Sequence, residues 1–157
     1  MRLSERMKKV PLLASADINA GVDSDSINMS NYIDASFDIV FGPSYAGAAG
    51  AIIKLFSGAT VGAKTTALTF NYRYTGGAIK AASGDILGTQ ATSAALQIAT
   101  ATMASRLLTV EIDAADMAAG HSWLTLEIGA EADAGEMTIM AHLTPKYASA
   151  AGVTCLT

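Results

Sequence analysis

The sequence predicts an all-β protein, an antiparallel β-sandwich or jelly roll of about eight strands. Three observations predict this fold. From residue 26 onward, large apolar residues recur at every second position in one short segment after another. Gly, Pro, Asn and Asp separate these segments, as turns between strands require. No stretch has the length and period of an ordinary α-helix, the usual crossover between parallel strands, so the strands should be mainly antiparallel.

The clearest strand covers 33–41, where apolar and polar side chains alternate until Gly42-Pro43. Similar segments follow at 52–56, 68–74, 95–100, 108–112, 123–128 and 137–143. Segment 78–92 is weaker, because Ile79 and Ile86-Leu87 stand between turn residues. Residues 113–117 predict a single helical turn.

Residues 1–24 predict an extended N-terminal arm, and residues 25–157 predict the sandwich domain. Residues 1–9 hold four basic side chains and one acidic one, while the remainder holds 6 basic and 13 acidic side chains. The chain as a whole carries a net charge of −4. A basic tip on an acidic body is typical of an interaction arm, and the acidic body disfavours nucleic acid. We expect removal of residues 1–13 to leave the domain folded.

Several classes of protein are disfavoured by composition. No apolar run approaches the roughly 18 residues that cross a membrane. The apolar stretch after Lys9 contains Pro11 and is too short for the core of a signal peptide. Cys155 is the only cysteine, so the chain can form no internal disulfide and no zinc site of thiolates alone.

The motifs that suggest chemistry have simpler interpretations. Residues 58–65 (GATVGAKT) approach a phosphate-binding loop, but Ala63 stands where the second glycine is needed and a strand follows, so a β-turn is favoured. His121 and His142 belong to no ligand-spaced cluster. Asp23 and Asp25 lack the further ligands of a calcium loop. We therefore expect no catalytic residue, no metal and no cofactor.

Trp123, Met140 and Val40 are apolar residues on otherwise polar strand faces. One interpretation is that they are scattered surface residues or part of a core that covers both faces. The other is that they form an oligomer or docking surface. The sequence leaves both interpretations open.

Four segments resemble the jelly-roll head decoration, or cement, proteins of tailed bacteriophages. They are DSINMSNY (25–32), LLTVEIDAAD (107–116), HSWLTLEI (121–128) and LTPKYA (143–148). The resemblance spans most of residues 25–148 and leaves out the basic N-terminus. Its motifs are structural patterns and contain no catalytic signature.

The resemblance implies a non-enzymatic virion protein that is made in the bacterial host cytoplasm. It would bind the outer surface of the capsid and bridge neighbouring capsomers. Its implied partners are the major capsid protein and further copies of itself, as a homodimer or homotrimer, with no direct nucleic acid and no membrane. The residues that we expect to make these contacts are Arg2, Arg6, Lys8, Lys9, Val10, Leu12, Leu13, Trp123 and Met140.

Two other functions remain open. A receptor- or carbohydrate-binding module of a phage fibre or tail should show exposed stacking aromatic residues. A hydrolase should show two close carboxyl groups in a cleft. The sequence contains neither signature in a recognisable form.

Overall fold

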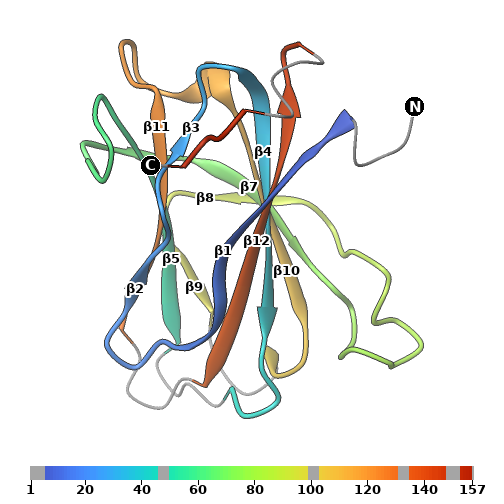
Figure 1. Cartoon of the computed structure of the whole chain (residues 1–157). Coiled ribbons are helices and arrows are strands. Elements are labelled where there is room, and N and C mark those ends of the chain that lie inside the picture. The colour runs from blue at the N-terminus through green and yellow to red at the C-terminus, as the bar shows by residue number, and fades with distance from the viewer. Residues whose placement is uncertain (1–5, 46–49, 99–102, 131–134, 148–152, 157) are drawn as a thin grey trace.

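A computed structural model describes residues 6–45, 50–98, 103–130, 135–147 and 153–156. Strands dominate these residues, and two antiparallel sheets pack face to face (Figure 1). The predicted all-β sandwich is therefore confirmed. The strands are β1 (Lys8–Asp17), β2 (Val22–Asp23), β3 (Ile27–Asn28), β4 (Tyr32–Phe41), β5 (Ala51–Gly58), β6 (Thr66–Leu68), β7 (Phe70–Tyr74), β8 (Ala91–Ser93), β9 (Leu96–Ile98), β10 (Leu107–Asp113), β11 (Trp123–Ile128) and β12 (Glu136–Pro145).

The pairing of the strands is that of a jelly roll. The first strand pairs with the last, β2 and β3 pair with β11, β4 pairs with β10, and β5 pairs with β6. The first sheet has the order β1-β12-β4-β10-β7-β8, and the second sheet contains β2, β3, β11, β5, β6 and β9. This nesting of early strands against late ones folds one long antiparallel ribbon into two sheets.

The structure has more strands than the eight expected, because some edge strands are interrupted. Residues 24–26 separate β2 from β3, and there the Ser24 hydroxyl oxygen accepts the Leu126 N–H at 3.1 Å. The predicted strand 68–74 changes sheet at Thr69, so that Leu68 lies in the second sheet and Phe70 in the first. Both side chains still point into the core, which is why the alternation in the sequence continues across the corner.

The core lies between the two sheets and is formed by the apolar residues that alternate along each strand. The first sheet contributes Phe37, Ile39 and Phe41 from β4, for example, and the second contributes Ile53 and Leu55 from β5. Tyr45 closes one end of the sandwich, where its hydroxyl donates to the Ile98 carbonyl oxygen at 2.8 Å. The predicted helical turn is confirmed as a short 3-10 helix at Ala114–Asp116.

The N-terminal boundary differs from the one expected from the sequence. Residues 8–17 are extended, as predicted for the arm, but they form β1, the edge strand of the first sheet. β1 pairs with β12 from Lys8 to Asp17, and β2 adds to the second sheet. Strands of the sandwich therefore lie on both sides of residue 24. The alternation of Lys8, Val10 and Leu12 with Lys9 and Pro11 accounts for this incorporation, because it gives β1 one apolar face.

The end of the chain also takes part in the sandwich. Cys155 is buried, and its carbonyl oxygen accepts the Asn28 N–H at 2.9 Å. Burial is the main cause that raises the pKa of the Cys155 thiol. Burial likewise raises the pKa of the nearby Tyr32 hydroxyl to about 12, with the neighbouring Cys155 as a further cause.

Candidate contact surfaces

The outer face of the first sheet carries part of the expected contact set at its β1 edge. Lys9 and Pro11 are exposed on β1, and Pro11 lies opposite Met140 on β12. The Met140 side chain is 37% exposed. We use the name β1 edge surface for Lys9, Pro11 and Met140 together with Arg6, which is exposed two residues before β1 begins. The opposite side of β1 has no strand partner among the residues that the structure describes. An edge strand with a Lys and a Pro is protected against unspecific pairing.

Three of the expected contact residues have other positions. Val10 and Leu12 are buried in the core at 3% and 9% exposure, so they are unavailable to a partner and the expectation for them is corrected. Leu13 is partly buried and packs against the same core. The physical reason is the strand period of two, which turns Val10 and Leu12 inward when β1 joins the sheet. Lys8 shares this inward direction and is half-buried, and Arg2 lies outside the described residues.

A polar network lies beside the β1 edge surface on the same face. Thr109 donates its hydroxyl to Asp38 Oδ1 at 2.9 Å, and His142 Nε2 lies 3.0 Å from Asp38 Oδ2. The other histidine is distant in the fold, where His121 Nδ1 lies 2.9 Å from Ser57 Oγ. Within the described ranges, no three His, Cys, Asp or Glu side chains are grouped in a way that could hold a metal ion.

Trp123 lies on the outer face of the second sheet, because its neighbour Leu124 points into the core. The loop 59–65 between β5 and β6 folds over this face. Gly62 donates its N–H to Ser26 Oγ at 2.9 Å, and Ser26 Oγ lies 2.8 Å from Thr125 Oγ1. Trp123 itself is half-buried on this face. The structure therefore places Trp123 and Met140 on opposite faces of the sandwich and does not bring them together.

Loop 59–65 also contains the segment that approaches a phosphate-binding loop in sequence. It is the turn of a β-hairpin, with the Thr65 N–H donating to the Ser57 carbonyl oxygen at 3.1 Å, which confirms the prediction of a β-turn in place of a phosphate loop. Lys64 of this loop bonds to Glu127 at 2.6 Å and to Asp23 at 2.9 Å. These hydrogen bonds, that from Glu127 first, raise the pKa of Lys64.

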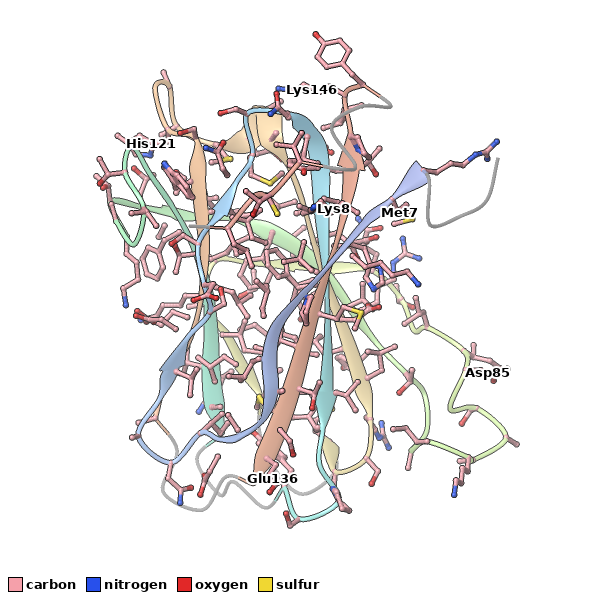
Figure 2. The ribbon with its side chains drawn as sticks, viewed as in Figure 1. Met7, Lys8, Asp85, His121, Glu136 and Lys146 are labelled. Carbon is pink, nitrogen blue, oxygen red and sulfur yellow. The ribbon has the colours of Figure 1, made fainter. Side chains whose placement is uncertain are left out.

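A surface that the sequence did not single out lies at residues 75–88, which we call the lobe. It projects from the first sheet between β7 and β8, with Asp85 near its tip (Figure 2). The exposed fractions are 51% for Ile79, 60% for Ile86 and 42% for Leu87. The only signal in the sequence was the presence of these aliphatic residues in a segment that otherwise reads as turns.

A groove of about 480 Å³ lies beside the lobe, between the inner face of β7 and β9. Its lining includes Tyr72, Tyr74, Leu96, Met103 and Arg106. The two tyrosine rings are stacked with centroids 6.4 Å apart. The groove is lined from both sheets, by β7 of the first and β9 of the second, and by the segment before β10.

Comparisons with known proteins add little to this description. No family model matches the sequence, and no curated protein matches it. Among solved structures, the chain is similar to the crystal structure of the SPBc2 prophage-derived protein YomS, with a TM-score of 0.49 and 11% sequence identity. The match covers 87% of this chain and 91% of that one. At this TM-score the likeness supports no statement about the function of this chain.

No helix among the described residues is long and apolar enough to cross a bilayer.

Proposed function

We propose that this chain is a structural protein of a tailed-bacteriophage virion that binds the outside of the capsid and cements neighbouring capsomers. Its partners are the major capsid protein and other copies of the chain, and it performs no catalysis. The sequence segments that resemble decoration proteins support this proposal. They fall on β10 and β11 and on parts of β3, β4 and β12, which are mostly central strands of the jelly roll.

The observation that carries the proposal is the separation of the apolar residues that are exposed or only half-buried on the outer surface. Met140 lies on one outer face, Trp123 lies on the opposite face, and Ile86 lies on the projecting lobe. A protein that binds one small ligand needs one concave site, whereas a protein that bridges neighbours needs contact surfaces on several sides. Rigid strands hold these surfaces at fixed positions, which suits attachment to a regular lattice.

The energy of attachment would come from many modest contacts. A stable interface buries roughly 1,200–2,000 Å² in total. Copies that also contact each other on one lattice reinforce each individual contact through multivalency. Arg6 and Lys9 add positive charge at the β1 edge surface of an otherwise acidic chain, so the complementary patch on the shell protein should be acidic.

A second candidate function is a carbohydrate-binding module of a fibre or tail, and the stacked rings of Tyr72 and Tyr74 in the groove favour it. Sugar rings pack on exposed aromatic faces, and Gln97 and Arg106 supply polar groups at the same site. A glycan array separates the two candidates, because specific glycan binding that is lost in Tyr74→Ala would favour the second.

The test of the proposed function is a decoration assay. Purified heads of the virus that encodes this chain, assembled without it, are mixed with the pure protein and then washed. Occupancy is read by gel densitometry and negative-stain imaging. We expect saturable binding to the outer surface and greater survival of the decorated heads on heating. The double variant Lys9→Glu with Met140→Glu should bind at least about tenfold more weakly.

The matched control for this assay is Asp116→Arg, which reverses a charge on the 3-10 helix, outside both the β1 edge surface and the lobe. It should saturate the heads at the wild-type concentration. Failure of the wild-type protein to bind heads at any concentration would remove the proposed function.

A further inference from the structure

The lobe is a hydrogen-bonded projection that carries exposed aliphatic side chains. Gly76 N–H donates to the Ile86 carbonyl oxygen at 3.0 Å, and Gly88 N–H donates to the Tyr74 carbonyl oxygen at 2.9 Å. Ile79 N–H reaches the Ser105 carbonyl oxygen at 2.6 Å, which ties the lobe to the segment before β10. Its aliphatic side chains are therefore held out in water by a hydrogen-bonded backbone. An exposed apolar cluster on an ordered scaffold indicates a docking surface.

The groove beside the lobe has the complementary chemistry. Its walls are the rings of Tyr72 and Tyr74 with Leu96 and Met103, and its charged group is Arg106. Arg106 Nη1 reaches only the Thr75 carbonyl oxygen, at 3.4 Å, and no carboxylate lies within ion-pair distance in the described parts of the chain. The groove thus offers an apolar cleft with a cation that lacks an anionic partner.

The tip of the lobe supplies what this groove lacks. Asp85 is exposed, forms no ion pair among the described residues, and directly precedes Ile86 and Leu87. An acidic residue followed by two aliphatic ones matches an arginine within an aromatic and aliphatic cleft. We propose that the occupant of the groove is the lobe of a second copy of this chain, with Asp85 of each copy facing Arg106 of the other.

The position of the two features favours a two-fold pair. The lobe and the groove meet at Tyr74, so they form one continuous surface. A two-fold contact pairs such a surface with itself, so that both lobes and both grooves are buried together. The proposed decoration function supposes an oligomer, and this inference deepens it by naming the surface of self-contact. The pairing of two copies is argued independently of that function, and only its biological purpose rests on the proposed function.

The experiment is a charge exchange between two variants of the full chain. Asp85→Arg places two arginines at each contact of a like pair, and Arg106→Asp places two aspartates there. Each variant alone should dissociate at least about tenfold more readily than the wild type in sedimentation equilibrium. An equimolar mixture should regain association, because both contacts of the mixed pair again join Arg to Asp. No rearrangement within one chain can produce that rescue.

Further variants keep the test decisive. Asp116→Arg makes the same charge change on the 3-10 helix and should associate like the wild type. Ile86→Ser should weaken association without an altered melting temperature, which covers the case that Arg106→Asp fails to fold. A wild-type chain that stays monomeric, single variants that associate normally, or a mixture that shows no rescue would each overturn the inference.

The same proteins separate this inference from the proposed function. A wild type that is monomeric in solution but still saturates heads would remove the self-contact and leave the decoration function standing. A chain that pairs through Asp85 and Arg106 but never binds heads would remove the decoration function and leave the self-contact standing.

Discussion

The backbone of Gly58 lies so close to Ala63 that any side chain at residue 58 would collide with it. A Cβ atom there would overlap the Ala63 carbonyl oxygen and lie 2.7 Å from the Ala63 Cβ. This contact closes the hairpin between β5 and β6, so Gly58 serves close backbone approach and has no role in phosphate binding.

We therefore expect Gly58→Ala to destabilise the protein by about 2–4 kcal/mol, because the hairpin must open to accept the methyl group. At Gly62 an added methyl group would meet no other atom within 4 Å, but the backbone has a φ of +73°. Gly62→Ala should therefore destabilise the protein by about 1 kcal/mol. Gly76→Ala, whose nearest neighbour would be 3.6 Å away, should be within about 0.5 kcal/mol of wild type. Urea unfolding of the three variants checks this order; equal effects would contradict it.

The incorporation of β1 gives a second prediction. Removal of residues 1–7 leaves β1 complete, so the melting temperature should not change. Val10→Ala should cost about 1–3 kcal/mol, because Val10 is buried between the sheets. Lys9 is the exposed neighbour of Val10, so Lys9→Ala should change the stability by no more than about 0.5 kcal/mol. Differential scanning calorimetry provides the measurement, and a stable variant that lacks residues 1–13 would show that β1 is dispensable.

The sequence could predict the fold class because period-two alternation records which face of each strand is buried. The strands at 33–41, 108–112, 123–128 and 137–143 all appear in the structure within a few residues. The sequence could not show that the strand 68–74 changes sheet at Thr69, because Leu68 and Phe70 face the core from either sheet.

The candidate contacts were harder to predict for a similar reason. The sequence predicts Val10, Leu12 and Leu13 as contact residues of an extended arm, because sequence alone does not tell whether an extended segment pairs at the edge of a sheet. The lobe was missed because its backbone is held by turns and by the bond from Ile79 to Ser105, which have no periodic pattern. Exposure of Ile79 and Ile86 is a three-dimensional property that composition does not record.

The contacts that hold loop 59–65 to the second sheet provide a third prediction, which separates buried from exposed polar contacts. Ser26→Ala should cost about 1–3 kcal/mol, because it leaves the buried Thr125 hydroxyl and the Gly62 N–H without their partner. Lys64→Met removes an ion pair with Asp23 and Glu127 that water screens, so its cost should stay below about 1 kcal/mol. Chemical denaturation of the two variants checks this ranking, and a larger loss for Lys64→Met would reverse the argument.

The Tyr32 hydroxyl predicts a loss of stability in alkali. Burial raises the pKa of Tyr32 to about 12 from an ordinary value of 10.0, so the folded state retains a proton that the unfolded state releases. The stabilising effect is complete below pH 10 and is lost as the pH rises from there through about 12. Its full size is on the order of 2 kcal/mol. Burial also raises the pKa of Cys155, which begins the decline at a slightly lower pH.

Tyr32→Phe removes the buried ionisable group, so its free energy of unfolding should fall less steeply than that of the wild type above pH 10. Tyr147→Phe is the matched control, because Tyr147 is 68% exposed and its loss should leave the wild-type slope unchanged. Guanidinium unfolding at intervals from pH 8 to pH 12 gives the slopes, and ultraviolet titration of the phenolate at the same points identifies the group. Equal slopes for wild type and Tyr32→Phe would mean that Tyr32 ionises without opposing the fold, and the alkaline loss would then have to come from Cys155 or from the exposed Lys64.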